Sequence, residues 1–304
     1  MRARVQRWRS ELRGHGLRTA ILLRLRGVAG TSELAESLAV YFDANNERVD
    51  RLERLAAIAP VMAWIDQATL ATAPLVSVIT PTRNRATVLP RAIASVLAQT
   101  YPNWELVIVD DASDDETAGV LASLSDPRIR PLRIEHAGCN AARNAGLDAA
   151  RGELIAYLDD DNTMHPGWLK SVVWGFEQRP EAAVLYGAIV IDDVGRGADG
   201  SPGTLPTTFI NPFDRDRLVD DNLADISAIA HRAGLAGARF DEGLVTLGDW
   251  DLLARLCAER DPLVLPAVAC FYSTDAPNRL TGGPTEPGDK QVVRERARVV
   301  RDGS

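Results

Sequence analysis

The sequence is poor in lysine and cysteine and has no long apolar run. Lysine occurs only at Lys170 and Lys290, so arginine supplies nearly all of the positive charge. No apolar stretch approaches the roughly 18 residues that a membrane-spanning helix needs, and the basic start is not followed by the apolar segment of a signal peptide. The three cysteines are odd in number and lack metal-ligand spacing. We therefore expect a cytoplasmic protein without a disulfide framework.

The net charge of −8 is distributed unevenly along the chain. Residues 1–30 contain eight arginines and one glutamate, a formal charge of +7, so residues 31–304 carry −8 − 7 = −15. Nonspecific nucleic-acid binding requires a basic surface. The acidic body of the chain therefore argues against nucleic acid as a partner.

Residues 1–72 show no strand-like alternation of apolar and polar residues. Apolar residues recur at helical spacing, as at Leu34, Leu38 and Tyr41. We expect a helical N-terminal region that packs on the rest of the chain or supports a homo-oligomer. An alternative is that the arginine-rich start lies on anionic lipid at the inner face of a membrane, where clustered cations bind by charge. An arginine-rich helical face is more often simply solvated.

From Leu75 onward, strand patterns alternate with helix patterns. Amphipathic helices separate predicted strands at residues 76–80, 105–110, 129–134, 154–158 and 182–191. Ser113 and Glu116 match a capping box at the start of one of these helices. The alternation predicts an α/β domain with a largely parallel sheet that helices cover on both faces. In such sheets, ligands bind beyond the carboxyl ends of the strands.

Polar side chains close several of the predicted strands. They are Thr82, Arg83 and Asn84 after the first strand, Asp110 and Asp111 after the second, and Asp159, Asp160 and Asp161 after the fourth. Three consecutive carboxylates repel one another unless a cation is present, and hard oxygen ligands suit Mg²⁺ or Mn²⁺. The alternative is that they cap the following helix, for which Pro166 suits the first turn. Capping accounts for one or two carboxylates, but not for three.

Five stretches resemble motifs of the family 2 glycosyltransferases, in the order and spacing of that family. They are residues 76–85 (VSVITPTRNR), 95–102 (SVLAQTYP), 107–113 (VIVDDAS), 142–146 (ARNAG) and 151–161 (RGELIAYLDDD). The resemblance implies the GT-A fold, a Rossmann-like, mostly parallel sheet flanked by helices, over residues 73–304. Residues 73–162 would form the nucleotide-binding half and residues 163–304 the acceptor-binding half.

The resemblance also implies roles for the residues at the strand ends. The residues expected to bind the nucleotide are Pro81, Thr82, Arg83, Arg85, Asp111, Arg143 and Asp160. Asp111 would accept a hydrogen bond from a pyrimidine imide. Asp159 and Asp161 match the DXD motif, which would hold Mn²⁺ or Mg²⁺ beside the diphosphate. Many relatives have tyrosine at the position of Arg83, and arginine can also stack on a base.

A second catalytic element is the sequence LGDWDL at residues 247–252. The family usually has Glu-Asp here, and its aspartate is the general base that removes the proton of the acceptor hydroxyl. In this chain Gly248 replaces the glutamate and Asp249 remains at the base position; the alternative is that Asp249 is the N-cap of the following helix. The expected acceptor contacts are Asn222, Trp250 and Asp251, and the alternative for Asp251 is a solvated position on the helix face. Residues 272–281 could close over the diphosphate, with Arg279 as the cation.

These features predict an inverting, metal-dependent glycosyltransferase. It would move a sugar from a UDP- or dTDP-sugar to an acceptor hydroxyl in the biosynthesis of a polysaccharide, a glycolipid or a glycosylated natural product. An alternative from a different class is an inactive nucleotide-sugar-binding or scaffold protein of the same fold, against which the joint presence of Asp111, Asp161 and Asp249 argues. A response-regulator receiver would need a late lysine, and neither lysine of the chain fits that position. A sugar nucleotidyltransferase would need a glycine-rich basic loop where this chain has residues 81–85.

Overall fold

The computed structural model describes residues 52–53, 55–191, 207–273 and 287–302. The chain divides into two units, Met1–Arg54 and Leu55–Ser304, and every element discussed below belongs to the second unit. The helices expected within residues 1–51 lie outside the described residues. None of the helices in the described ranges is long and apolar enough to cross a membrane.

Residues 55–67 form a helix of the second unit, although the sequence analysis assigned them to the N-terminal region. Ile58 of this helix packs with Ala188, Ile210 and Val268. In the structure the second unit therefore begins at Leu55, upstream of the predicted boundary at residue 72.

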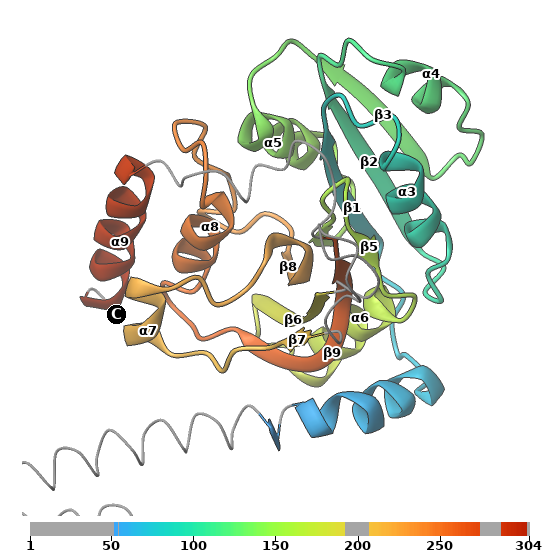
Figure 1. Ribbon diagram of the computed structural model, residues 1–304. Helices are drawn as coiled ribbons and strands as arrows, with labels where there is room; N and C mark the ends of the chain where they lie inside the picture. Colours follow the sequence, from blue (N-terminus) through green and yellow to red (C-terminus); the bar gives the residue numbers. More distant parts are fainter. Residues whose placement is uncertain (1–51, 54, 192–206, 274–286, 303–304) are drawn as a thin grey trace, which may run out of the picture. The chain divides into compact units, whose positions relative to one another are not determined.

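The first part of the second unit is a parallel sheet (Figure 1). Its strands are β1 (Val76–Thr82), β2 (Trp104–Asp111), β3 (Ile129–Ile134) and β4 (Leu154–Tyr157), in the order β3-β2-β1-β4. The connecting helices are α3 (Leu89–Leu97), α4 (Thr117–Ala122) and α5 (Cys139–Ala149). Every residue of β1 and β2 is buried, because a parallel sheet has both faces covered.

The second part adds strands of both directions. Its elements are β5 (Thr163–Met164), α6 (Trp168–Gln178), β6 (Val184–Ile191), β7 (Thr207–Phe209), α7 (Arg215–Asp220), the 3₁₀ turn η1 (Ile226–Ala228), β8 (Ile229–Arg232), α8 (Gly248–Leu256), β9 (Leu263–Tyr272) and α9 (Pro287–Asp302). The described strands form one nine-stranded sheet of order β3-β2-β1-β4-β8-β6-β9-β5, with β7 paired to β6. β8 is antiparallel to β4 and to β6, whereas β6 and β9 are parallel. The parallel pairing predicted from the sequence thus applies to the first part, and the second part is mixed.

Helices cover both faces of this sheet (Figure 1). On one face, Leu89 of α3 and Trp168 of α6 belong to one apolar cluster, to which α4 also contributes. On the other face, Leu252 of α8 and Val293 of α9 pack in a second cluster with Tyr157 of β4. Because apolar burial covers the two faces, the polar residues that follow β1, β2 and β4 lie at the edge of the sheet.

The predicted capping box of Ser113 and Glu116 is wrong. α4 begins at Thr117, and the Thr117 amide donates to Asp115 Oδ1 at 2.9 Å. The Ser113 hydroxyl instead accepts from the Asn84 amide at 2.9 Å, while Asn84 Oδ1 accepts from the Asp114 amide at 2.8 Å. These two bonds join the loops that follow β1 and β2, and so they fix one wall of the site.

Candidate active site

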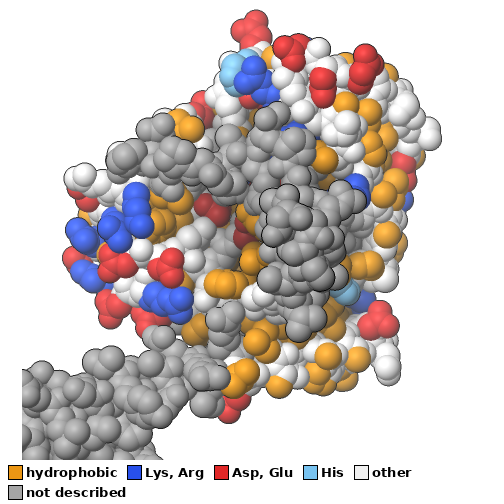
Figure 2. All heavy atoms as spheres, viewed as in Figure 1, with side chains coloured by type: hydrophobic (Ala, Val, Ile, Leu, Met, Phe, Trp, Pro, Cys, Tyr) orange, Lys and Arg blue, Asp and Glu red, His pale blue; other side chains and the backbone are white. Residues whose placement is uncertain are grey.

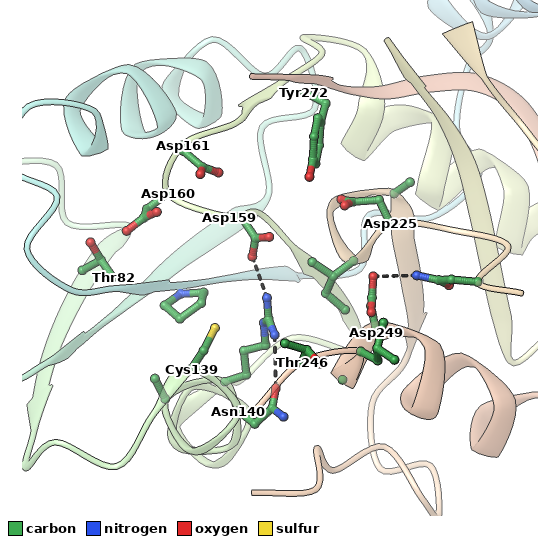
Figure 3. Close-up of a pocket in the computed structure, with 18 of the residues that line it drawn as sticks. Thr82, Cys139, Asn140, Asp159, Asp160, Asp161, Asp225, Thr246, Asp249 and Tyr272 are labelled. Atoms are coloured by element: carbon green, nitrogen blue, oxygen red, sulfur yellow. Dashed lines mark hydrogen bonds and ion pairs between the residues drawn. The ribbon is translucent and has the colours of Figure 1, made fainter. Parts of the chain in front are cut away.

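A pocket of about 830 Å³ lies at the carboxyl ends of β1, β2 and β4. Four groups of sequence-predicted residues line it: residues 81–85, Asp111, residues 159–161 and Asp249. Arg143 and Asn222 also line it. The close-up in Figure 3 shows the carboxylates of Asp159, Asp225 and Asp249 directed toward a common space. Segments far apart in the sequence therefore form a single site.

Asp111, at the end of β2, is held by three donors. Its Oδ1 accepts from the Ala137 amide at 2.7 Å, and its Oδ2 accepts from the Gly138 amide at 3.0 Å. His136 Nδ1 lies 2.8 Å from the same Oδ2, and Arg83 Nη1 lies 2.7 Å from His136 Nε2. Because arginine only donates, His136 Nε2 accepts from Arg83 and His136 Nδ1 donates to Asp111. The sequence analysis did not assign a role to His136; its position directly after β3, at the same edge as Asp111, was the available signal.

The three aspartates after β4 differ in their surroundings. Asp159 Oδ1 accepts from Arg143 Nη2 at 2.8 Å. Arg85 Nε is 3.7 Å from Asp160 Oδ1, and Arg85 Nη2 is 4.0 Å from Asp161 Oδ2. The pKa of Asp160 is raised to about 7, chiefly by burial and also by the charges of Asp161 and Asp159, against the lowering effects of a hydrogen bond from Thr82 and of the charge of Arg85. Two arginines, Arg85 and Arg143, thus lie beside the three carboxylates at this strand end.

Asp159 and Asp161 fit a divalent cation that is shared with a diphosphate. Mg²⁺ in such sites commonly binds one or two carboxylates together with substrate phosphates. A cation would also relieve the repulsion that raises the Asp160 pKa. Within the described ranges, no group of three or more His, Cys, Asp or Glu side chains is arranged to hold a metal ion by itself. The ligand roles of Asp159 and Asp161 stay predictions.

Asp249 lies on the opposite side of the pocket from Thr82 and Asp160 (Figure 3). Its Oδ2 accepts from Asn222 Nδ2 at 2.8 Å, and its Oδ1 accepts from the Trp250 amide at 2.9 Å. Burial raises the pKa of Asp249 above the ordinary aspartate value. The alternative of an N-cap is wrong, because Leu247 occupies that position and Asp249 is the second residue of α8. Asn222 reaches the site as expected and orients this carboxylate.

The structure gives a steric reason for glycine at position 248. A Cβ at Gly248 would lie 2.6 Å from Asn140 Oδ1. Asn140 is itself fixed, because its Nδ2 donates to the carbonyl oxygens of Asp241 and Leu244, both at 2.9 Å. The family's usual glutamate therefore has no room beside Asp249 in this chain.

Trp250 and Asp251 do not line the pocket, so their expected acceptor contacts are wrong. Trp250 is 2% exposed, and its Nε1 donates to the Leu218 carbonyl at 2.6 Å. Asp251 is 0% exposed, which also excludes the solvated alternative. Its carboxylate binds Arg255 Nη2 at 2.7 Å and Arg296 Nη1 at 2.9 Å. Both side chains therefore stabilise α8 through contacts away from the pocket.

Asp225 is a site residue that the sequence analysis missed. It precedes η1, its Oδ1 accepts from the Ser227 amide at 2.9 Å, and its carboxylate lies near Asp249 in Figure 3. Burial raises its pKa, and the charges of Asp159 and Asp249 raise it further. Asp225 falls in an irregular segment with no motif, so only the folded arrangement reveals it. Arg279, expected to cover the diphosphate, lies outside the described residues.

Comparison with family models matches residues 77–231 to Glycosyl transferase family 2. The chain is 33% identical over 190 residues to the putative colanic acid biosynthesis glycosyl transferase WcaA of Escherichia coli K12, which covers 61% of this chain and 67% of WcaA. It is 34% identical over 199 residues to the succinoglycan biosynthesis protein ExoO of Rhizobium meliloti 1021, which covers 61% of this chain and 56% of ExoO. The chain thus spans little more than half of ExoO and about two thirds of WcaA.

Among solved structures, Staphylococcus aureus TarS 1-349 in complex with UDP-GlcNAc matches with a TM-score of 0.60 at 20% sequence identity. The match covers 74% of this chain and 66% of the TarS chain. This likeness confirms the predicted GT-A fold. Since the family model matches residues 77–231, about half of the chain, the chain belongs to glycosyl transferase family 2.

Proposed function

We propose that this protein is an inverting glycosyltransferase that moves a sugar from a UDP- or dTDP-sugar to an acceptor hydroxyl. The observation that carries the proposal is the convergence of Asp111, the aspartates 159–161 and Asp249 on one pocket. A nucleotide at one end and a base candidate at the other would place the anomeric carbon between them. The complex of TarS with UDP-GlcNAc supports a uridine donor for this fold.

The nucleotide would bind to residues whose side chains already hold one another in place through hydrogen bonds and ion pairs. Asp111 Oδ1 has one amide donor and retains capacity to accept from a pyrimidine imide N–H. Arg83 is linked to Asp111 through His136, and its planar guanidinium is a group on which the base can stack. Arg85 and Arg143 place positive charge beside Asp159 to Asp161, at the position proposed for the diphosphate.

Asp159 and Asp161 would hold Mn²⁺ or Mg²⁺. A divalent ion bound there supplies charge that stabilises the departing diphosphate. The acceptor-side chemistry falls to Asp249. As the acceptor oxygen forms a bond to the anomeric carbon, the bond from that carbon to the diphosphate breaks, and the hydroxyl proton moves to an Asp249 oxygen. Attack opposite the leaving group inverts the configuration in one displacement.

The names of the relatives indicate a biosynthetic role. WcaA is described by colanic acid biosynthesis and ExoO by succinoglycan biosynthesis. We propose by analogy that the acceptor is a growing polysaccharide or its glycolipid precursor. We also propose that the part of the chain before Leu55 docks the enzyme on a membrane surface or on a second copy of the chain, because residues 1–30 carry a formal +7.

The direct test is a donor screen with product analysis. Purified protein is incubated with UDP-, dTDP- and GDP-sugars and Mn²⁺, and release of the nucleoside diphosphate is measured. We expect turnover with a uridine or thymidine donor and loss of turnover with EDTA. When a hydroxyl-bearing acceptor is added, NMR of the product from an α-linked donor should show a β-glycoside. Binding of a donor without any turnover would favour the inactive binding protein, and a retained α-linkage would refute inversion.

A further inference from the structure

The segment that leads into Asp249 is held from two sides. This segment, residues 241–247, contributes Val245, Thr246 and Leu247 to the pocket wall. On one side Asn140 of α5 donates to the carbonyl oxygens of Asp241 and Leu244. On the other side lies the C-terminal helix α9, which packs along α7 and α8 (Figure 1).

Asp289, in the first turn of α9, binds this segment through one carboxylate oxygen. Its Oδ2 accepts from the Val245 amide at 3.0 Å, the Thr246 amide at 2.7 Å and the Thr246 hydroxyl at 3.0 Å. Asp289 is 8% exposed, so these bonds are shielded from water. Hydrogen bonds to an ionised acceptor are stronger than those between neutral groups.

Arg296, two turns further along α9, binds one residue before Asp249 in the sequence and one after it. Its Nη2 donates to Asp241 Oδ2 at 2.6 Å, and its Nη1 donates to Asp251 Oδ1 at 2.9 Å. Val293 lies between Asp289 and Arg296 on the helix and is 0% exposed. α9 therefore contacts both the segment before α8 and α8 itself, the helix that carries Asp249.

The contacts of Asp289 lie directly before an unusual backbone turn at Leu247. Leu247 has φ 59°, a left-handed conformation that a branched side chain rarely adopts. Such conformations persist where surrounding contacts impose them, and they cluster at functional sites. The direction in which α8 begins, and with it the position of the Asp249 carboxylate, depends on this turn.

We propose that Asp289 is a positioning residue for Asp249, so that the C-terminal helix belongs to the acceptor side of the catalytic machinery. The inference rests on the proposed role of Asp249 as the base. Asp289 does not line the pocket, so it acts through the backbone of Val245 and Thr246 and not by touching substrate. A displacement of about 1 Å at a reacting group can cost a factor of about 10² in rate.

The test is a double-mutant cycle on the hydrolysis of UDP-glucose, with water as the acceptor, and on UDP affinity measured by calorimetry. Asp289→Ala should lower kcat by roughly 10- to 100-fold, with the donor KM and UDP affinity unchanged. Asp289→Asn retains one acceptor oxygen and should recover most of the rate. The double variant Asp249→Asn/Asp289→Ala should hydrolyse UDP-glucose no more slowly than Asp249→Asn alone. Asp302→Ala, an exposed carboxylate at the far end of α9, is the matched control.

Each other outcome has a distinct meaning. If the two losses multiply in the double variant, or if UDP affinity falls with kcat, Asp289 is a general structural contact and the inference is overturned. If Asp249→Asn alone keeps full activity, or if wild type does not turn over UDP-glucose while binding UDP, the proposed function for this donor fails first. If Asp289→Ala does not fold, Thr246→Val removes one of the three bonds and enters the same cycle, with a loss of about threefold expected for one weakened contact.

Discussion

Gly248 and Asn140 face each other so closely that a single added methyl at Gly248 would stand 2.6 Å from Asn140 Oδ1. Gly248→Ala should therefore lower the free energy of unfolding by roughly 1–3 kcal/mol, the usual effect of overpacking. Urea denaturation measures it. Gly288→Ala, at an open position near the start of α9 with nothing within 4 Å, is the control and should be neutral. An unchanged stability for Gly248→Ala would mean that Asn140 moves aside without loss.

The carboxylate of Asp249 is expected to take the proton of the acceptor. Asp249→Asn keeps the size of the side chain and removes the basic oxygen, so transfer should fall by about 10²–10⁴-fold. Donor affinity should stay nearly the same, because Asp249 lies across the pocket from Thr82 and Asp160, which are expected to bind the nucleotide. Steady-state kinetics with separate UDP titrations measures both quantities. Equal losses in rate and UDP affinity would assign Asp249 to donor binding instead.

Asp161 provides a test of the cation that does not depend on turnover. Asp161→Asn should weaken UDP binding in Mn²⁺ at least about tenfold, since a metal ligand is lost. UDP binding in EDTA should be the same for the variant and the wild type. Isothermal titration calorimetry gives both values. Equal UDP affinity with and without Mn²⁺ in the wild type would contradict a cation at this strand end.

The pKa of Asp160 predicts how its contribution to stability changes with pH. The folded-state pKa of about 7 lies above the ordinary value of about 3.9, so the folded state binds the proton more tightly than the unfolded state. This favourable contribution is fully present below pH 4 and is lost as the pH rises toward 7. Asp160→Asn does not titrate. Its Tm relative to wild type in EDTA should rise by at least roughly 2 °C from pH 4.5 to 7.5, and a constant difference would show that Asp160 is ordinarily ionised.

The arginine-rich start should be separable from catalysis. Deleting residues 1–30 removes a formal +7 and none of the pocket residues. Donor hydrolysis should be unchanged, while binding to vesicles with anionic lipid, or the oligomeric state in solution, should change. Sedimentation of protein with vesicles and light scattering measure these two properties. Loss of UDP binding on deletion would place the start of the catalytic unit upstream of residue 31.

The sequence predicted well which residues of the parallel strands meet at the pocket, because these residues stand at the ends of regular strands. Asp111 ends β2 and Asp159 follows β4, and the parallel pairing of those strands with β1 brings the two residues to the same edge of the sheet. The side of the pocket around Asp249 was harder to predict, since its side chains come from irregular segments and from the first turn of α8. Helical spacing alone could not show that Asp251 points inward to two arginines while Asp249 points to the pocket.

Two more features depended on contacts between distant segments. The Ser113 hydroxyl bonds to Asn84 on another loop, a long-range competitor that a local capping pattern does not reveal. Asp225 reaches the pocket because β8 pairs with β4. The periodicity of the sequence does not predict that β8 is an antiparallel partner of β4. Figure 2 shows acidic and basic side chains intermixed over α7 and α9, so charge composition gave no indication that Asp289 and Arg296 have internal partners.

Because β8 is antiparallel to β4, the segment before β8 can change independently of the parallel strands β1, β2 and β4. β8 runs against β4, so the start of β8 lies beside the end of β4, and the Ser227 hydroxyl accepts from the Asp159 amide at 3.3 Å and from Asn162 Nδ2 at 3.2 Å. The segment before β8 enters the site from outside the parallel sheet and carries Asn222 and Asp225. It can lengthen, shorten or change side chains without altering the pairing of β1, β2 and β4. Changes in this segment would therefore reshape the pocket beside Asp249 while the residues at the ends of β1, β2 and β4 stay in place.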